Sequence, residues 1–323
     1  MNYDKLTEKK RRLDQYYPLP SALMRNLEEW FLVELTYTSN AIEGNTLTRQ
    51  ETALVVEKGL TVGGKSLVEH LEATNHAQAL VWIRDKVGSK LKDLNEKSIL
   101  HIHNIILKSV DDANAGKYRD VSVRISGSNV ILPNPRKVPE LMQEFCNWLN
   151  KSCDLHPALL AAEAHYRLVT IHPFVDGNGR TARLLMNMIL LMRGYPAAII
   201  RKRDRLSYIN ALEKAQLGGS KDQYLELIFK AVDRSFDIYL KAAKGETASR
   251  VDAVILLKIG ELAKQVGESN STIRHWTKEG LLEIAEITSA GYGLYAPEMI
   301  KRIRKIHALK EKRYTLLEIK EML

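Results

Sequence analysis

The chain has 323 residues, of which 45% are hydrophobic, a size and composition that give room for two or three domains and exclude an intrinsically disordered protein. No apolar run reaches the length of a transmembrane helix, so we expect no membrane partner. The net charge of +9 permits nucleic acid or phosphorylated ligands but identifies neither. Cys146 and Cys153 lie about two turns apart in a helical pattern, too far for a disulfide, which predicts reduced thiols and a cytoplasmic protein.

Most of the chain has apolar residues at three- and four-residue spacing, the pattern of helices that bury one face. Several of these segments begin at Asp, Ser, Asn or Pro, which are common at helix starts. We therefore expect an all-α fold. The predicted helices cover residues 23–38, 48–58, 67–87, 96–109, 138–151, 157–171, 178–193 and 222–241.

Residues 121–132 break the helical pattern. They are rich in β-branched side chains, alternate along their first arm, turn over residues 126–129 and end before Pro133. This pattern predicts a β-hairpin. Because one hairpin cannot form the core of a sheet, we expect it to be a flap over another part of the molecule.

Residues 172–183, His-Pro-Phe-Val-Asp-Gly-Asn-Gly-Arg-Thr-Ala-Arg, combine the groups that phosphoryl or nucleotidyl transfer needs. The two glycines let backbone N–H groups converge at the start of a predicted helix, where an anion is favoured. Asp176 supplies an oxygen ligand for Mg²⁺ beside that anion. His172 can accept a proton near neutral pH. Arg180 and Arg183 can reach the same anion from the first helical turn.

This segment resembles the signature of the Fic family, His-x-Phe-x-Asp/Glu-Gly-Asn-Gly-Arg-x-x-Arg, and fills each of its fixed positions. The similarity extends over about residues 20–240. It implies a helical Fic domain that transfers AMP from ATP to a Ser, Thr or Tyr hydroxyl of a protein. ATP would be the substrate and Mg²⁺ the cofactor.

The resemblance also implies roles for individual residues. His172 would be the general base that activates the target hydroxyl, and Asp176 would hold Mg²⁺. The predicted ATP-binding residues are Gly177, Asn178, Gly179, Arg180, Arg183 and Tyr208. Residues 116–119 and the hairpin after them look like the family's flap, which would hold the target by strand addition. The predicted target-positioning residues are Ser128, Asn129, Val130 and Ile131.

A second signature lies nearer the N-terminus. Ser39, Glu43 and Gly44 fit the pattern Ser/Thr-x-x-x-Glu-Gly/Asn, which is similar to the inhibitory motif of Fic proteins. Its place before the catalytic motif resembles the subgroup with an N-terminal inhibitory helix. The resemblance implies that Glu43 pairs with Arg183 and takes the space of the γ-phosphate. The alternative is a helix that ends at Gly44 with Glu43 as a surface carboxylate.

Residues 59–66 match the phosphate-binding loop G-x-x-x-x-G-K-S letter for letter. That loop needs a buried strand before it and a parallel sheet around it. The preceding residues 48–58 are more helical than strand-like, and no βαβ pattern surrounds them. We therefore expect an ordinary turn here.

Residues 257–323 have the pattern of a small helical unit with a turn at residues 266–269, followed by a second helix, a wing at residues 290–295 and two more helices. This part resembles the DNA-binding domain of the MerR family, over about residues 255–323. DNA is therefore an expected partner, and a protein-interaction module is the alternative. The predicted DNA-binding residues are Ser271, Thr272, Arg274 and Lys301.

The sequence thus predicts an N-terminal helical region with the inhibitory motif (1–95), a Fic catalytic core (96–241), a linker (242–252) and a MerR-like winged helix-turn-helix domain (253–323). The main hypothesis is an auto-inhibited protein adenylyltransferase with an unidentified protein target. The alternatives are a DNA-binding transcription regulator whose Fic domain senses nucleotide, and removal of AMP at the same site. His172 favours an enzyme, since a sensor needs no base. Homo-oligomerisation stays open.

Overall fold

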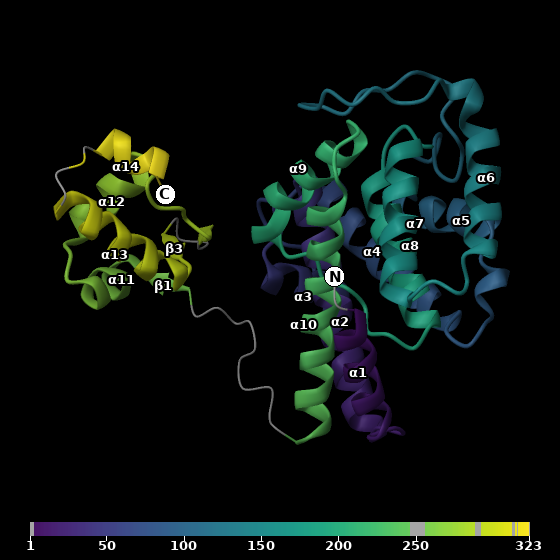
Figure 1. Ribbon diagram of the computed structural model, residues 1–323, viewed down its shortest axis with the longest axis horizontal. Helices are drawn as coiled ribbons and strands as arrows, with labels where there is room; N and C mark the ends of the chain where they lie inside the picture. Colours follow the sequence, from purple (N-terminus) through teal and green to yellow (C-terminus); the bar gives the residue numbers. More distant parts are fainter. Residues whose placement is uncertain (1–2, 246–255, 288–291, 312–313, 315, 323) are drawn as a thin grey trace. The chain divides into compact units, whose positions relative to one another are not determined.

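The computed structural model describes residues 3–245, 256–287, 292–311, 314 and 316–322 (Figure 1). The chain forms two compact units, residues 1–247 and 248–323. The larger unit contains the helices α1 (Tyr3–Asp14), α2 (Ser21–Glu43), α3 (Arg49–Lys58), α4 (Leu67–Asp85), α5 (Glu96–Leu107), α6 (Val138–Lys151), α7 (Pro157–Ile171), α8 (Asn178–Met192), α9 (Arg205–Gln216) and α10 (Asp222–Ala243). Three short 3₁₀ turns lie at Leu91–Asp93, Pro135–Lys137 and Lys202–Asp204.

Helices α7 and α8 form the centre of the larger unit and are joined by the loop 172–177. Helix α8 is buried around almost its whole circumference, as expected for a helix that other helices surround. The alanines of α7 are buried as well, and their small side chains let the two helices approach closely. Helices α2, α4 and α5 pack on α8, while α6 and α10 pack on α7. The all-α prediction for this unit is confirmed.

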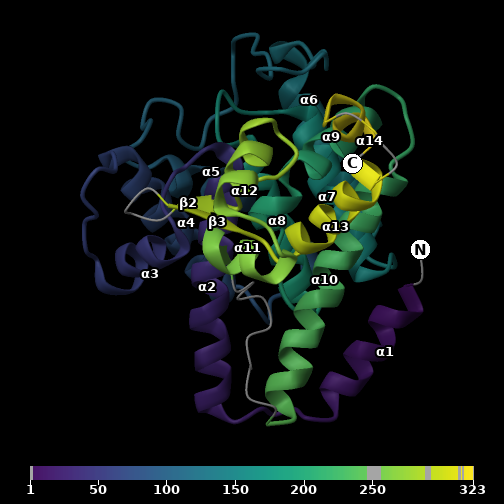
Figure 2. The ribbon, with the colours of Figure 1, turned by 90° about the vertical axis from the view of Figure 1, so that its left-hand side faces the viewer.

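Helix α1 lies alongside α10 and was not predicted (Figures 1 and 2). It buries only Leu6 and Leu13, so its apolar pattern is too sparse to stand out in the sequence. Ion pairs between lysines of α1 and aspartates of α10 also hold α1 against α10. Lys9 Nζ lies 2.7 Å from the Asp233 carboxylate and 2.6 Å from the Asp237 carboxylate.

Helix α2 continues five residues past its predicted end and stops at Glu43, because Gly44 takes the left-handed conformation that ends helices (φ 106°). The loop 59–66 lies between α3 and α4 and has no strand before it in residues 3–58. Gly59 ends α3, and Ser66 caps α4 together with Glu69. The expected turn is confirmed, and the phosphate-loop match is coincidental.

The segment 121–132 turns at Gly127 (φ 76°), where Ser128 N donates to Ile125 O at 3.2 Å. The turn was predicted correctly, but all of these residues are described and none is in a strand, so the prediction of paired strands is wrong. Figure 1 shows the segment as an extended arm before α6. Side chains of other segments, described below, fix its two ends. We call residues 119–133 the flap.

The smaller unit consists of β1 (Leu257–Lys258), α11 (Ile259–Val266), α12 (Asn270–Lys278), β2 (Glu286–Ile287), β3 (Gly293–Tyr295), α13 (Glu298–Glu311) and α14 (Leu316–Met322). Its sheet has the order β1-β3-β2, with both pairs antiparallel. Gly267 (φ 73°) and the N-cap Ser269 make the turn between α11 and α12. Trp276 and Ile303 lie in its core. The predicted winged helix-turn-helix is confirmed, with residues 288–291 of the wing outside the described part.

Of the predicted linker 242–252, residues 242–243 belong to α10 and residues 246–252 lie outside the described part. Across the described ranges, the structure contains no helix with the length and apolar character that crossing a membrane requires.

Candidate active site

The loop 172–177 makes a sharp connection between α7 and α8 through two residues with positive φ. His172 ends α7 at φ 51°, which is uncommon for a residue other than glycine, and Gly177 begins α8 at φ 75°. A Cβ at Gly177 would lie 3.2 Å from Ile106 and 3.3 Å from His103, so this position needs glycine for space as well as for conformation.

The imidazole of His172 is oriented for proton transfer. Its Nδ1 lies 3.3 Å from Val169 O. A carbonyl oxygen only accepts, so Nδ1 carries the hydrogen and Nε2 keeps its lone pair. Burial lowers the pKa of His172 below its ordinary value, which keeps the ring neutral at pH 7. The side chain is therefore ready to accept a proton at Nε2.

The shape of the loop is fixed by Asn178 and Phe174. The Asn178 side chain accepts from Phe174 N and donates to Phe174 O, both at 2.9 Å. Both side-chain groups of Asn178 are thus used within the loop, and only its backbone remains for the predicted contact with phosphate. Phe174 is fully buried in the core.

His103 of α5 contacts the loop through Phe174 and Asp176, and it was not predicted as a site residue. Its ring stacks on Phe174 with centroids 3.6 Å apart. Gly116 N donates to His103 Nδ1 at 2.9 Å, so Nε2 carries the hydrogen and donates to Asp176 O at 3.0 Å. Burial lowers the pKa of His103 to about 4. A histidine on the buried face of a predicted helix was the only sequence signal for this role.

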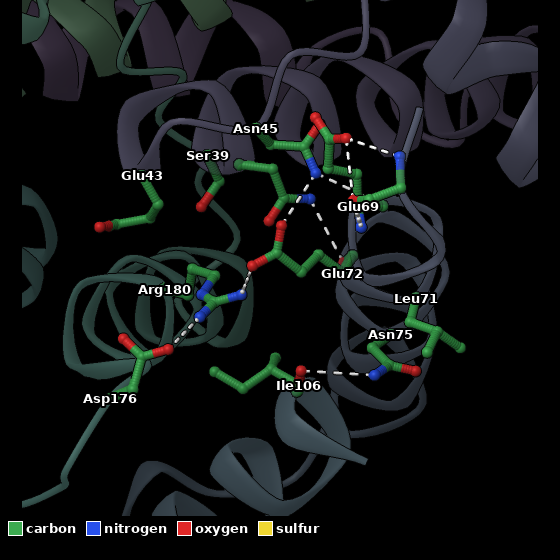
Figure 3. A network of polar contacts seen from close by, with 12 residues as sticks. Ser39, Glu43, Asn45, Glu69, Leu71, Glu72, Asn75, Ile106, Asp176 and Arg180 are labelled. Atoms are coloured by element: carbon green, nitrogen blue, oxygen red, sulfur yellow. Dashed lines mark hydrogen bonds and ion pairs between the residues drawn. The ribbon is translucent and has the colours of Figure 1, made fainter. Parts of the chain in front are cut away.

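Arg180 is buried between two carboxylates (Figure 3). It donates to Asp176 at 2.9 Å and to Glu72 of α4 at 2.8 Å. Glu72 in turn accepts from Asn45, directly after α2, at 2.9 Å. Arg180 therefore orients the Asp176 carboxylate and connects the loop to α4, in addition to its predicted role at the phosphates. Glu72 was missed because a carboxylate on an amphipathic helix is usually solvated.

The Asp176 side chain is 68% exposed. In the described part of the chain, no three His, Cys, Asp or Glu side chains gather so that they could hold a metal ion on their own. A single exposed carboxylate fits Mg²⁺, which is commonly bound by one or two carboxylates together with phosphate oxygens and water.

Arg183 is buried and donates three hydrogen bonds to residues of the predicted inhibitory motif. It donates to Ser39 Oγ at 2.9 Å, to Ser39 O at 3.0 Å and to Glu43 at 2.7 Å. Burial lowers the pKa of Arg183, but the Glu43 carboxylate reverses this effect and leaves the pKa raised. The predicted pairing of Glu43 with Arg183 is thus present.

The Glu43 carboxylate lies where the N-terminus of α8 favours an anion. A Cβ at Gly179 would collide with it and would lie 3.0 Å from Arg183, so both groups contact the backbone of the first turn. Arg205 fixes the end of α2 by donating to Ile42 O at 2.6 Å. The Glu43 carboxylate therefore lies over the first turn of α8, where the partial positive charge of a helix N-terminus favours an anion.

Tyr208 lies behind Arg183 instead of on an open surface. The side chain is 2% exposed, and its hydroxyl is 2.7 Å from His165 Nε2. Tyr208, one of the predicted ATP-binding residues, thus lies beside the Arg183 guanidinium, with which its hydroxyl interacts.

Both ends of the flap are held by side chains. At its base, Arg119 donates to His172 O at 2.8 Å and to Pro133 O at 2.6 Å. At its tip, Glu213 of α9 accepts from Ser128 Oγ at 2.8 Å and from Asn129 N at 2.9 Å. Of the remaining predicted flap residues, Val130 is half-buried and Ile131 is 95% exposed.

In the smaller unit, three of the predicted DNA-binding residues are exposed: Ser271 and Arg274 on α12, and Lys301 on α13. Thr272 is half-buried, and its backbone N–H donates to the N-cap Ser269 at 3.1 Å. Ser271 and Arg274 therefore present a hydroxyl and a cationic group on α12, the helix that corresponds to the one that enters the groove in helix-turn-helix proteins.

Comparison with known proteins found a family match in each of the two units. Residues 93–190 match the Fic/DOC family, and residues 257–323 match the MerR HTH family regulatory protein. Protein adenylyltransferase Fic from Drosophila virilis is 40% identical over 239 residues, which cover 73% of this chain and 48% of the relative. The same-named protein from Nematostella vectensis is 37% identical over 242 residues, 73% of this chain and 55% of the relative. The chain thus spans about half the length of these curated relatives.

Solved structures of Fic proteins are similar to this chain in sequence and in fold. Fic-1 (residues 134–508) from C. elegans is 32% identical with a TM-score of 0.68, over 75% of this chain and 73% of that one. A Fic domain containing signaling protein from Bacteroides thetaiotaomicron is 30% identical with a TM-score of 0.69, over 76% of this chain and 100% of that one. By sequence and by fold, the chain belongs to the Fic/DOC family.

Proposed function

We propose that the chain is a protein adenylyltransferase, which transfers AMP from ATP to a Ser, Thr or Tyr hydroxyl of a protein, and that Glu43 inhibits it. One observation carries the proposal: a neutral His172 with a free Nε2 stands beside the exposed carboxylate of Asp176 and the N-terminus of α8. The names of the curated relatives support the same reaction.

In the proposed reaction, the target hydroxyl oxygen bonds to the α-phosphorus of ATP while the bond from that phosphorus to the bridging oxygen breaks. Pyrophosphate leaves, and Nε2 of His172 takes the hydroxyl proton. Asp176 would hold Mg²⁺, which when bound neutralises charge on the phosphates. The backbone of Gly177 and Gly179 would donate to phosphate oxygens at the start of α8.

Inhibition follows from competition between two anions for one place. The Glu43 carboxylate lies over Gly179 and pairs with Arg183 at 2.7 Å. A phosphate that used the α8 N-terminus and the Arg183 guanidinium would have to displace it. This arrangement supports assignment to the subgroup with an N-terminal inhibitory helix. If a water were activated instead of a target hydroxyl, the same site would remove AMP from the target.

The flap would hold the target. Its arms are extended but pair with no strand within residues 121–132, so the backbone groups that make no hydrogen bond within the protein would bind a target strand. Exposed Ile131 would add an apolar contact with the target segment.

The test is intact-mass analysis after incubation with ATP and Mg²⁺. We expect Glu43→Gly to gain the mass of AMP, wild type to gain little, and the double variant Glu43→Gly, His172→Ala to gain none. Equal labelling of wild type and Glu43→Gly would contradict inhibition. No labelling of Glu43→Gly, either of itself or of proteins in a cell lysate, would favour a nucleotide-sensing regulator.

A second function is carried by the smaller unit. We propose that it binds DNA, because it has the winged helix-turn-helix fold, matches the MerR HTH family and exposes Arg274 and Lys301. Binding to a mixed duplex should weaken as salt rises, since phosphate contacts release counterions. Substitution of Lys301 with Ala should reduce this salt dependence, while salt-independent or absent binding would favour a protein-interaction module.

We also propose a cytoplasmic location, in keeping with the free thiols of Cys146 and Cys153.

A further inference from the structure

A chain of buried hydrogen bonds runs behind Arg183 and is not used by the proposed chemistry. It links His165 of α7, Tyr208 of α9 and Tyr224 of α10, all of which are buried. Tyr208 Oη lies 2.7 Å from His165 Nε2, and Tyr224 Oη lies 2.8 Å from His165 Nδ1. The Tyr208 hydroxyl also interacts with the Arg183 guanidinium.

The position of each hydrogen in this chain follows from its two ends. Tyr224 donates to Ala162 O at 2.9 Å, and a carbonyl can only accept. Tyr224 has no second hydrogen, so His165 Nδ1 must donate to Tyr224 Oη. Burial, and then the charge of Arg183, lower the pKa of His165 to about 3, so the ring is neutral and Nε2 is an acceptor. Tyr208 therefore donates to Nε2.

One consequence is that the lone pairs of Tyr208 Oη are left for Arg183. A guanidinium can only donate, so this is the one arrangement in which all these groups are satisfied. Burial raises the pKa of Tyr208 to about 12, which keeps its hydroxyl protonated. On its other side, Arg183 donates to Ser39 and Glu43. The guanidinium is thus held between α9 and α2.

We infer that Tyr208, supported by His165, is a positioning residue that fixes the Arg183 guanidinium for both of its anions: Glu43 in the inhibited state and the phosphates of ATP in the active state. This inference rests on the proposed function for its second half. Since both anions use the same fixed cation, loss of the Tyr208 hydroxyl weakens both interactions together. Loss of a residue that merely stabilised the fold would leave the effect of Glu43→Gly on the rate unchanged.

The experiment is a double-mutant cycle on the full chain. The rate of AMP transfer is measured for wild type, Tyr208→Phe, Glu43→Gly and the double variant, with the midpoint of unfolding for each. We expect Tyr208→Phe to reduce the rate of Glu43→Gly about tenfold, the effect of one hydrogen bond to a charged group. The activation factor is the rate with Glu43→Gly divided by the rate without it. It should be smaller in the Tyr208→Phe background than in the wild-type background by a similar amount.

The matched control is Tyr166→Phe. Tyr166 is on α7, near the same core, and its hydroxyl donates to Ala215 O at 3.1 Å instead of taking part in the chain. We expect this change to leave the activation factor unaltered. An equal loss of activation in Tyr166→Phe and Tyr208→Phe, or no loss in either, would overturn the inference. If Tyr208→Phe does not fold, Tyr224→Phe should show the same effect more weakly, because it removes the acceptor of His165 Nδ1.

Equilibrium binding separates this inference from the proposed function. In the Glu43→Gly background, Tyr208→Phe should weaken binding of ATP about tenfold and leave binding of AMP, which has no γ-phosphate, unchanged. That result without any AMP transfer would support the positioning role and contradict the transferase. Equal weakening for ATP and AMP would overturn the positioning role.

Discussion

The carboxylate of Glu43 lies 2.7 Å from the guanidinium of Arg183, although 140 positions separate the two residues along the chain. The ion pair connects the last turn of α2 with the first turns of α8. It places a negative charge where the proposed reaction needs the phosphates of ATP. We therefore expect the same pair to contribute to stability and to oppose activity, and these two effects can be measured separately.

We predict that Glu43→Gly lowers the free energy of unfolding by about 1–3 kcal/mol, between the values for exposed and buried pairs, because Arg183 loses its carboxylate while remaining buried. ATP should then raise the unfolding midpoint of Glu43→Gly more than that of wild type, since a phosphate can take the vacated place. Thermal unfolding with and without ATP measures both effects. A variant as stable as wild type, or equal shifts with ATP, would show that the pair matters little.

The pH dependence of transfer should report the pKa of His172. Burial lowers this pKa and neighbouring Arg119 lowers it further, whereas Val169 O, Glu43 and Asp176 raise it, with a net decrease. A general base works only when unprotonated, so the rate should be flat near pH 7 and should fall only below about pH 6.5, the ordinary value.

Initial rates of Glu43→Gly between pH 5 and 8, with unfolding checked at each pH, test this expectation. Removal of Glu43 takes away one group that raises the pKa, so this variant should keep its activity to lower pH than wild type. If the rate already fell during acidification from pH 8 to pH 7, this result would contradict a buried, neutral His172.

We predict that His103→Phe lowers the rate of transfer about tenfold and destabilises the chain by about 1–3 kcal/mol. The new ring can still stack on Phe174, but Gly116 N loses its acceptor and Asp176 O loses its donor. The matched control is His101→Phe, two positions away on the exposed side of α5. The rate of transfer and the denaturant unfolding of both variants test this prediction. Equal effects of His103→Phe and His101→Phe would contradict a specific role of His103.

Residues 172–183 could be predicted from the sequence as the candidate active site, because their polar and glycine residues lie within twelve consecutive positions. Its supports could not be predicted, because they come from other helices. Glu72 holds Arg180 from α4, His103 holds Asp176 from α5, and both look like ordinary residues of amphipathic helices. Only the packing of the helices around α8 shows which polar side chains face inward.

The flap shows a different limit. Its β-branched residues and its glycine turn predict a hairpin, and the turn forms, but the arms do not pair. Strand propensity describes how a side chain fits a half-buried surface, and within residues 3–245 no sheet is present to supply such a surface. The flap is held instead by Arg119 at its base and by Glu213 at its tip. The alternating pattern of side chains in its sequence cannot reveal these contacts.

This leads to a prediction for Glu213, whose carboxylate accepts from Ser128 and Asn129 at the tip of the flap. Glu213→Ala should release the tip, so that trypsin cleaves after the exposed Arg124 several-fold faster than in wild type. Glu213→Gln keeps an acceptor and should restore most of the protection. Binding of ATP should be unchanged in both variants, while the KM for a protein target should rise in Glu213→Ala, because a looser flap holds the target strand less well. Cleavage at the wild-type rate would show that Arg119 alone keeps the flap in place.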